Sequence, residues 1–556
     1  MHQRRRQPVP TIRRRAPLPC PGVKHPALRR WGVATSALCL LLVAAAATPP
    51  MASAASSPCS STRTGPDLNG DGFDDAVVGD PYASVNGHRE AGAIVVLYGD
   101  ADCRIGEGWR RVITQATPGV PGTPEAGDHF GWSVALADLT NSRRTDVLVG
   151  SPGEDVGTLA DAGSVHVVSF AEGRPGAPVS AVALTQDALR GVAEAGDQFG
   201  YTVAAAASLG DDAGTLAAAG APGEDIAGVL DAGEVDAFGF DITWRLTAIF
   251  QQGTTKTSPF AFPVSGIAQP GDRFGASLLI AQLNAPFTGD VLGGPSWTYV
   301  MGAPGDMVSS EDGAGSVSLV YDQTGATEVV SQDSEGVQGA AEAGDAFGAS
   351  LAVHETSSWI DAETRALPRS LAVGAPGEDV GAVADAGSVT LFRSEVTGLA
   401  GRGAFSQQSA GFAGRVETGD RFGSSVAMRP RLGSSDAVLV VGVPYEDVGG
   451  VVDAGSVQTV AVTPTAVRPL RDYTEASANT PGTVAARNRF GSTVSAMKGR
   501  TESLWTASSP YKGAGSVFLS SSSGQQRSWV PGRGGVPQPG AGGRFGWAVS
   551  GLESGS

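Results

Sequence analysis

The sequence predicts an all-β protein in which one structural unit occurs seven times along 556 residues. Three observations indicate this fold class. A Phe-Gly pair recurs, a short stretch of small residues ending in proline follows most copies, and short runs of β-branched residues lie between these marks. The 78 glycines are about twice the usual share, which favours frequent turns over long helices.

The Phe-Gly pairs divide the chain into units of 55 to 75 residues. The phenylalanines of these pairs are Phe130, Phe199, Phe274, Phe347, Phe422, Phe490 and Phe545. We expect each ring to pack between neighbouring units. The glycine that follows it permits a close approach of two backbones that a Cβ would block.

Each unit is expected to contain four short strands. Segments such as residues 146–150 and 164–168 are rich in β-branched residues, are bounded by Gly, Pro and Asp, and show no helical period. Four strands per unit, repeated radially, predict a seven-bladed β-propeller of four-stranded blades. A solenoid is the competing repeat fold, but its repeats are usually only about 20 to 45 residues long.

The two ends of the chain predict how the ring closes. The first copy has a proline mark, Gly79-Asp80-Pro81, without a Phe-Gly pair, and the last copy has Phe545-Gly546 without a proline mark. We therefore predict that residues 67–115 form an N-terminal half-blade that residues 544–556 complete. Pairing of the C-terminal strand with this half-blade would remove the open edges of a linear array.

Residues 1–54 predict an export signal. They contain nine basic residues and no acid, an apolar run over residues 31–47, and an Ala52-Ser53-Ala54 cleavage site. The mature protein, residues 55–556, is expected to be secreted and to keep no transmembrane anchor. The general secretory and twin-arginine routes both stay open. Cys59 and Cys103 are the thiols left after cleavage, and we predict that they form a disulfide.

The repeats resemble the FG-GAP repeats of integrin alpha-subunit propellers and of bacterial secreted proteins that share them. The resemblance rests on Phe130-Gly131, on Gly150-Ser151-Pro152 and on their counterparts, and covers about residues 60–556. It implies a propeller with an adhesion-type binding function. Integrin-like signalling is not expected, because the chain has no Arg-Gly-Asp and no transmembrane helix after the propeller.

Residues 67–75 match the pattern D-x-N-x-D-G-x-x-D. Calcium prefers six to eight hard oxygen ligands, and alternating residues of a tight loop can supply them. The predicted ligands of one Ca²⁺ are the side chains of Asp67, Asn69, Asp71 and Asp75 and the carbonyl of Phe73. The loop is not an EF-hand, because Val78 occupies position twelve. The alternative is a solvated Asx-rich turn. In the equivalent loop at Asp138, Arg143 replaces the glycine, so no second ion is expected there.

A second acidic set follows the proline marks in four units. Its members are Glu154, Asp155, Asp161, Glu224, Asp225, Asp231, Glu378, Asp379, Asp385, Glu446, Asp447 and Asp453. In the propeller topology of the related family these loops share one face with those that hold Asp128 and its counterparts, so they would form an acidic rim. Such a rim could attract cations or basic partners. The alternative is a set of turns whose Asp side chains bond their own backbone.

The motifs predict binding without catalysis. The four mature histidines lie in different units, and neither H-E-x-x-H nor G-x-S-x-G occurs. A formal charge of −17 argues against a nucleic-acid partner. We expect a monomeric module for a protein, cell-surface or glycan ligand. One alternative is a carbohydrate-binding propeller, which would use Trp132, Tyr201 and Trp547. The other is a hydrolase or lyase that uses paired carboxylates.

Overall fold

The computed structural model describes residues 65–550, apart from residues 102–103, 174–178, 190, 207–214, 241–243, 254–260, 285–294, 323, 355–368, 396, 431–435, 478–479, 481, 499–502, 522–525, 534–535 and 539. The predicted export signal, the predicted disulfide of Cys59 and Cys103, and residues 551–556 lie outside the described residues. No helix among the residues described here is long and apolar enough to cross a membrane.

The described strands form seven sheets, which we number as blades 1 to 7. Blade 1 contains β29 (Ala548–Ser550), β1 (Ala76–Asp80), β2 (Ala93–Leu97) and β3 (Arg110–Ile113). Blade 2 contains β4 (Ser133–Ala137), β5 (Asp146–Ser151), β6 (Ser164–Phe170) and β7 (Val179–Leu184), followed by the short helix α1 (Gln186–Leu189). Blade 3 contains β8 (Thr202–Ala206), β9 (Leu216–Ala221), β10 (Glu234–Phe240), β11 (Trp244–Gln252) and β12 (Ala261–Val264).

The other four blades each contain four strands in chain order. Blade 4 contains β13 (Ser277–Asn284), β14 (Pro295–Ala303), β15 (Ser316–Tyr321) and β16 (Ala326–Val330). Blade 5 contains β17 (Ser350–His354), β18 (Ser370–Ala375), β19 (Ser388–Glu395) and β20 (Gly398–Phe405). Blade 6 contains β21 (Ser425–Pro430), β22 (Ala437–Val443), β23 (Ser456–Val462) and β24 (Val467–Tyr473). Blade 7 contains β25 (Val494–Lys498), β26 (Ser503–Ser508), β27 (Val517–Ser521) and β28 (Gln526–Trp529).

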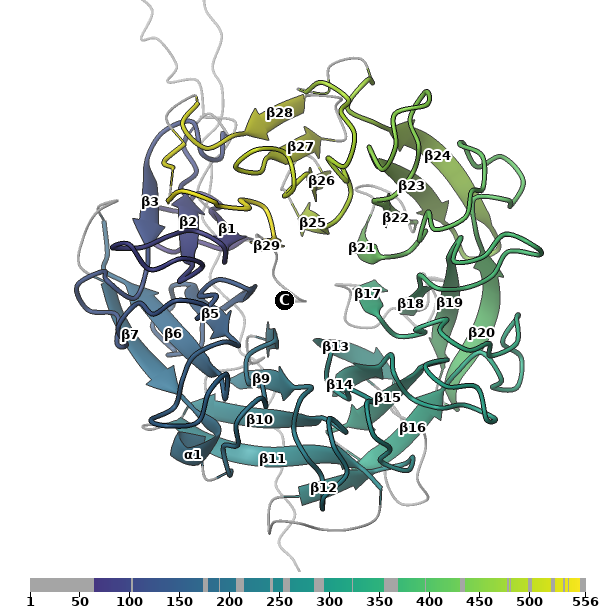
Figure 1. The fold of residues 1–556 in the computed structure, drawn as a ribbon, viewed down its shortest axis with the longest axis horizontal. Coiled ribbons are helices and arrows are strands. Elements are labelled where there is room, and N and C mark those ends of the chain that lie inside the picture. The colour runs from purple at the N-terminus through teal and green to yellow at the C-terminus, as the bar shows by residue number, and fades with distance from the viewer. Residues whose placement is uncertain are drawn as a thin grey trace, which may run out of the picture. The chain divides into compact units, whose positions relative to one another are not determined.

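The predicted fold class, an all-β seven-bladed propeller of four-stranded antiparallel blades, is confirmed (Figure 1). Blade 3 adds one feature that the repeat did not predict. Its fifth strand, β12, pairs parallel with β11, with Ile249 opposite Ala261. This strand lies at the outer edge of the sheet, where it adds to the blade without changing the ring.

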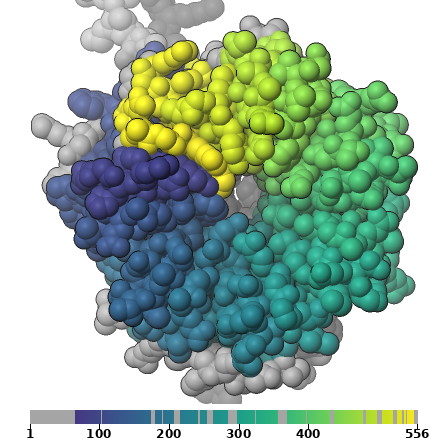
Figure 2. Space-filling model, in the orientation of Figure 1, coloured from purple at the N-terminus to yellow at the C-terminus, as the bar shows by residue number. Residues whose placement is uncertain are grey.

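The innermost strands of neighbouring blades contact one another in cyclic order, from β29 through β4, β8, β13, β17, β21 and β25 back to β29. β29 pairs antiparallel with β1, with Val549 opposite Val78. Blade 1 therefore takes its inner strand from the C-terminal end and its other strands from the N-terminal part (Figure 1). The packed blades surround a central opening (Figure 2).

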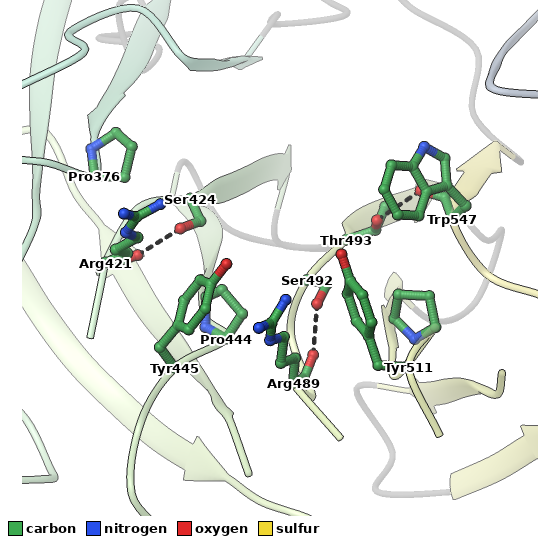
Figure 3. Close-up of a pocket in the computed structure, with 11 residues that line it drawn as sticks. Pro376, Arg421, Ser424, Pro444, Tyr445, Arg489, Ser492, Thr493, Tyr511 and Trp547 are labelled. Atoms are coloured by element: carbon green, nitrogen blue, oxygen red, sulfur yellow. Dashed lines mark hydrogen bonds between the residues drawn. The ribbon is translucent and has the colours of Figure 1, made fainter. Parts of the chain in front are cut away.

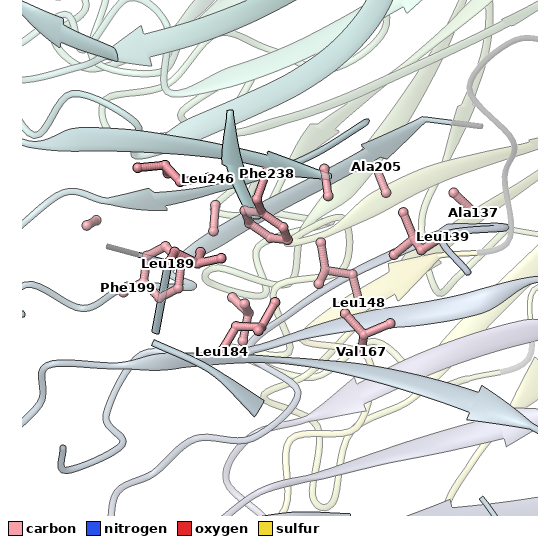
Figure 4. Packing of buried hydrophobic residues seen from close by; sticks show 14 of the residues in the cluster. Ala137, Leu139, Leu148, Val167, Leu184, Leu189, Phe199, Ala205, Phe238 and Leu246 are labelled. Carbon is pink, nitrogen blue, oxygen red and sulfur yellow. The ribbon is translucent and has the colours of Figure 1, made fainter. Parts of the chain in front are cut away.

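Seven hydrophobic clusters occupy the interfaces between neighbouring blades, and each contains one phenylalanine of a Phe-Gly pair. Phe199, for example, belongs to the same cluster as Leu148 of blade 2 and Phe238 of blade 3 (Figure 4). All seven rings are at most 2% exposed. Burial of a Phe side chain contributes about 1.5–3 kcal/mol, so these rings are a principal source of cohesion between blades.

The repeated glycines lie where two neighbouring blades come closest. A Cβ on Gly150, just before the proline mark of blade 2, would lie 1.9 Å from the carbonyl oxygen of Gly200 in the next Phe-Gly pair. Five further pairs repeat this approach, from Gly79 with Gly131 to Gly442 with Gly491. Blade 7 has Ser508 instead, and its Cβ lies 2.9 Å from the position that a Cβ on Gly546 would occupy. In the six blades that have glycine at both marks, backbone atoms of neighbouring blades meet where a Cβ would lie.

The antiparallel order places two kinds of loop on opposite faces. The Phe-Gly pairs and proline marks adjoin the first end of each inner strand, and we call this side the FG face. Residues 67–75 precede β1 at the other end of that blade, because β1 and β29 run in opposite directions. The predicted calcium loop therefore lies on the face opposite the Phe-Gly pairs.

Candidate functional site

The loop of residues 67–75 folds as a series of Asx turns. The Asp67 carboxylate accepts hydrogen bonds from the amides of Gly70 (2.6 Å) and Gly72 (2.9 Å), and Asn69 Nδ2 donates to Asp71 Oδ2 over 2.8 Å. Gly70 and Gly72 have φ of 76° and 88°, a region that glycine adopts without strain. The side chains of the first three predicted ligands therefore share one small loop.

Asp75 is held in a different way from the other predicted ligands. Its two carboxylate oxygens accept the amides of Leu68 and Gly99, both over 2.9 Å. Burial raises the pKa of Asp75 well above its usual range, and the nearby charges of Asp71 and Asp67 raise it further. Within the described ranges, no group of three or more His, Cys, Asp or Glu side chains is arranged to hold a metal ion. The donor types suit calcium, and each Asp75 oxygen accepts one backbone amide, which leaves a second lone pair on each.

The predicted calcium loop is attached to blade 2. The backbone amide of Asp67 donates to Thr145 Oγ1, and the Thr145 amide donates to the Asp67 carbonyl, both over 3.0 Å. The Gly173 amide also donates to the Asn69 carbonyl over 2.9 Å. The loop therefore links blade 1 to blade 2.

The equivalent loop of blade 2 keeps this conformation without the ligand set. The Asp138 carboxylate accepts the amides of Ser142 (2.9 Å) and Arg143 (2.7 Å). Asn141 and Arg143 have φ of 54° and 63°, as the glycines have in the first loop. The turn thus forms with Arg143 in the glycine position, so the conformation alone does not identify a metal site.

The predicted acidic rim contains two different groups of side chains. The second aspartate of each loop donates its amide to the first: Asp161 to Asp155 over 3.1 Å, Asp231 to Asp225 over 2.9 Å, Asp385 to Asp379 over 3.0 Å and Asp453 to Asp447 over 2.9 Å. These eight aspartates therefore form the self-bonded turns that the alternative interpretation describes.

The four glutamates of that set lie between blades. Each accepts a hydrogen bond from a glutamine of the preceding blade, and the pairs are Gln115–Glu154, Gln186–Glu224, Gln332–Glu378 and Gln407–Glu446. Glu224 and Glu446 are only 8% and 7% exposed. Burial raises the pKa of Glu154 to about 7 and that of Glu446 to about 8. Glu224 and Glu446 at least are interface residues, in contrast to the exposed rim that we expected.

Blade 3 breaks the repeat with two further buried acids that sequence reasoning missed. Glu234 and Asp236 replace the serine and the neutral residue found at these positions in blades 2 and 4 to 7, such as Ser164 and His166. They are 4% and 1% exposed, and burial raises the pKa of Asp236 to about 7 and that of Glu234 well above its usual range. The change from Ser to Glu within the repeated Ala-Gly-Ser-Val motif, at Glu234, was the sequence signal that could have revealed these two acids.

The FG face also carries a continuous series of arginines and aromatic rings, which we call the arginine–aromatic belt. Its members are Tyr82, His129, Trp132, Tyr201, Arg273, Arg421, Tyr445, Arg489, Tyr511, Arg544 and Trp547. The predicted aromatic residues Trp132, Tyr201 and Trp547 all belong to it. Trp132 lies 4.8 Å from Trp547 and 5.5 Å from Tyr201, measured between ring centroids.

The arginines of the belt alternate with tyrosines across blades 6, 7 and 1. Arg489 lies over the rings of Tyr445 and Tyr511, 4.6 Å from each centroid. Arg544 continues the series over Tyr511 at 4.7 Å and over Tyr82 at 4.2 Å. Cation–π contacts of this kind contribute about 0.5–2 kcal/mol each. None of these arginines forms an ion pair with an acid in the described part of the chain.

Three of the four tyrosines of the belt, Tyr82, Tyr445 and Tyr511, result from a local departure in the repeat. Pro81, Pro444 and Pro510 are each followed by tyrosine, whereas the other four proline marks are followed by glycine. In blade 2 a Cβ on that glycine, Gly153, would lie 1.9 Å from the carbonyl oxygen of Gly127. The Pro-Tyr dipeptides were the sequence signal that could have located the belt.

A pocket of about 260 Å³ lies within the belt, at the inner ends of blades 5, 6, 7 and 1 (Figure 3). Arg421, Tyr445, Arg489, Tyr511 and Trp547 line it, with the guanidinium of Arg489 between the two tyrosines. None of the 11 described residues that line it is Asp, Glu, His or Cys. The pocket is thus cationic and aromatic, in a chain whose formal charge is −17.

Three hydroxyl groups complete the pocket. Ser424 Oγ donates to the Arg421 carbonyl over 2.8 Å, Ser492 Oγ donates to the Arg489 carbonyl over 2.7 Å, and Thr493 Oγ1 donates to the Trp547 carbonyl over 2.7 Å (Figure 3). Because each hydroxyl hydrogen is committed to a backbone carbonyl, the oxygens remain as hydrogen-bond acceptors.

Comparison with known proteins agrees with the fold. The blades and their close-packed glycine marks define a seven-bladed β-propeller built from a repeated unit. The chain contains FG-GAP repeats: a family model of the FG-GAP repeat matches residues 60–97 and 130–168. The resemblance inferred from Phe130-Gly131 and its counterparts is therefore confirmed.

Solved structures with a related fold are numerous, since 118 chains match. One is the periplasmic gluconolactonase PpgL of Pseudomonas aeruginosa, which is 13% identical to this chain. The match covers 85% of this chain and 98% of that one, with a TM-score of 0.40. A search of curated proteins gave no significant match.

Proposed function

We propose that the protein is a secreted, monomeric, non-catalytic binding module whose ligand occupies the pocket in the arginine–aromatic belt. The observation that carries this proposal is the set of arginines stacked on aromatic rings and left without acidic partners. Arg, Tyr and Trp are the residues that contribute most to binding at protein interfaces. We expect the ligand to be a protein, a cell-surface component or a glycan.

The composition of the pocket supports binding over catalysis. The hydroxyls of Ser424 and Ser492 donate to backbone carbonyls, and among the described lining residues neither has a base beside it. Nucleophilic and acid–base catalysis both need such a base or a titratable acid within hydrogen-bond reach. The carboxyl groups of Glu224 and Glu446, which are buried, and of Glu154, which is partly buried, instead accept hydrogen bonds from glutamines between blades.

A structural Ca²⁺ in the loop of residues 67–75 is part of this proposal. Its ligands would be Asp67, Asn69, Asp71, Asp75 and the Phe73 carbonyl, all hard oxygens of the kind that calcium prefers. Asp67 and Asn69 are 5% and 1% exposed, and the loop is attached to blade 2 through Thr145. An ion there would stabilise the contact between blades 1 and 2, far from the FG face.

A comparison of surface retention tests the proposed function. Fluorescently labelled protein is incubated with cell-envelope preparations, and the wild type is compared with the double variant Arg489→Glu, Tyr511→Ala. We expect the variant to lose retention, and the control Arg468→Gln, on the exposed side of the outer strand β24 and outside the belt, to keep it. Equal retention of wild type and double variant would contradict binding at the pocket.

The same preparation is screened for turnover of glycoside, ester, lactone and polysaccharide-lyase substrates. We expect no turnover above the buffer background. Turnover that the double variant abolishes would assign a hydrolase or lyase activity to the pocket and would overturn the non-catalytic proposal.

A further inference from the structure

We propose that the pocket binds an acidic saccharide, a sugar ring that carries a carboxylate or a sulfate group. This inference rests on the proposed function and names the chemical class of its ligand. Three features of the pocket, its cations, its hydroxyl acceptors and its aromatic faces, lead separately to that class.

The arginines that line the pocket, Arg421 and Arg489, favour a ligand with an anionic group. The Nε atom of Arg489 is buried and has no hydrogen-bond partner within the described chain. Its side chain is held in place by Tyr445 and Tyr511, so little rotamer entropy is lost when its N–H groups meet a ligand. Guanidinium groups pair with planar or multi-oxygen anions through parallel hydrogen bonds. A cationic ligand would be repelled by Arg421, Arg489 and Arg544.

The hydroxyl groups call for a ligand that also donates hydrogen bonds. Ser424, Ser492 and Thr493 present acceptor oxygens, because their hydrogens bond backbone carbonyls. A simple inorganic anion near neutral pH offers them few or no hydrogens. A sugar offers several hydroxyl donors beside its charged group, and so can satisfy both kinds of pocket atom at once.

The aromatic rings of the pocket favour a ligand that has an apolar face. Tyr511 and Trp547 both line the pocket, with ring centroids 6.3 Å apart and planes at 60°. The C–H face of a pyranose ring is apolar and packs on such surfaces, as ligands generally do in aromatic-lined pockets. The volume of about 260 Å³ is small for a ligand pocket, for which roughly 300–1,000 Å³ is usual, so it favours one or two rings.

The exposed aspartates on the same face restrict how a charged glycan can approach. Asp379 and Asp385 of blade 5 are exposed, and their loop begins after Pro376, which lines the pocket. A long polyanion lying across the FG face would be repelled by these like charges. The ligand is therefore the charged end of a saccharide chain and not an internal segment.

A glycan array tests the inference. The exported protein is applied to uronate-, sialate- and sulfate-terminated oligosaccharides and to their uncharged counterparts, and the strongest acidic glycan is then titrated by calorimetry. We expect affinity for that glycan at least about tenfold above its uncharged counterpart, falling with added salt because the ion pair is screened. The separate uronate, sialate and sulfate arms identify the anionic group.

Two variants assign the binding to the pocket. Arg489→Gln should lower the affinity for the acidic glycan about tenfold and leave the weak affinity for the uncharged one unchanged. The backbone tolerates this change, because Gln198 occupies the equivalent position with a φ of 59° against 52° for Arg489. Arg468→Gln is the control, since Arg468 is an exposed arginine of β24 that belongs neither to the pocket nor to the belt. It should bind as the wild type does.

Three outcomes would overturn the inference. Equal affinity for charged and uncharged glycans would show that the arginines do not select the ligand. If inorganic sulfate binds as tightly as a sulfated glycan, the pocket is an anion site that does not recognise the sugar. Absence of binding to every acidic glycan, with pocket-dependent retention on cell envelopes intact, would reject the saccharide and leave the proposed function standing. Loss of that retention as well would reject both.

Discussion

Val78, in the first strand of the chain, pairs with Val549, in the last. This pair lies in the innermost ladder of blade 1, where β29 contacts both β25 and β4. The ring thus depends on a strand of three residues, Ala548–Ser550, that comes from the opposite end of the polypeptide.

Removal of residues 548–556 should destabilise the protein by at least about 2 kcal/mol, since it exposes the edge of β1 and the interface clusters beside it. The free energy of unfolding in denaturant measures the loss, and size-exclusion chromatography should show association through the exposed edge. A second truncation that removes only residues 551–556 keeps β29 and serves as control. Unchanged stability in the longer truncation would contradict this role of β29.

Stability should fall as the pH rises from about 4.5 to about 8. Burial raises the pKa of Glu446 from its ordinary 4.5 to about 8, and Asp420, Asp472 and Glu417 face it with like charge. The folded state therefore binds more protons than the unfolded state in this range, and each such group changes the stability by at most about 1.4 kcal/mol per pH unit. The stabilisation is complete below pH 4.5 and lost above pH 8.

Glu446→Gln should reduce this pH dependence and raise the stability at pH 8, because the amide can still accept a hydrogen bond from Gln407. Thermal unfolding at pH 5 and pH 8 measures both effects. Asp447→Asn, in the same loop, is the control that should leave the pH dependence as it is. Identical pH profiles for Glu446→Gln and the wild type would argue against titration of Glu446.

Calcium should raise the thermal midpoint of chelator-treated protein. A ligand at about 100 times its dissociation constant stabilises the folded state by about 2.7 kcal/mol. Asp71→Ala should abolish this response, and Asp138→Ala, in the matching turn of blade 2, should retain it. A calcium response that survives Asp71→Ala would place the ion elsewhere, and no response in the wild type would remove the site.

Gly150→Ala should destabilise the protein by about 2 kcal/mol or more, because its Cβ would meet the carbonyl oxygen of Gly200 at 1.9 Å and force neighbouring blades apart. Gly108→Ala provides the comparison, since no atom lies within 4 Å of that Cβ position. Denaturant unfolding of the two variants should separate them clearly. Equal stability would mean that the interface can widen without cost.

Arg544→Gln should cost about 1–2 kcal/mol, because its guanidinium stacks on Tyr82, Tyr511 and Trp547 and has no acidic partner among the described residues. Arg273→Gln, which loses one stacking contact at 5.5 Å over Tyr201, should cost less. Thermal unfolding at two salt concentrations checks the cause, since a stacked cation should be less sensitive to salt than a surface ion pair.

The fold could be predicted because the repeat is a packing requirement. Phe199 fills an interface, and Gly150 and Gly200 touch through their backbones, so each mark of the unit had a steric reason to recur. β12 could not be predicted, because among the described strands only blade 3 has a fifth one.

The candidate site was only partly predictable. Trp132 and Trp547 were predicted as the aromatics that a carbohydrate-binding propeller would use, and both are partly buried in the belt. Tyr445 and Arg489 were not predicted, because they become neighbours only when blades 6 and 7 pack side by side. For the acidic motifs the prediction erred in the other direction, because it placed buried glutamates on a surface rim. Glu224 and Glu446 follow the same pattern as exposed aspartates, and only the packing of the preceding blade's glutamine shows that they are buried.

The arginine–aromatic belt crosses the junction between the two chain ends, where Arg544 stacks on Tyr82. Tyr82 is therefore among the first residues of the belt to be translated, and Arg544 and Trp547 are the last. A product released early from the ribosome would lack Arg544 and Trp547 even if its finished blades folded, and would be inert toward the ligand. Under the proposed function, ligand binding therefore needs both sides of this junction in one folded ring.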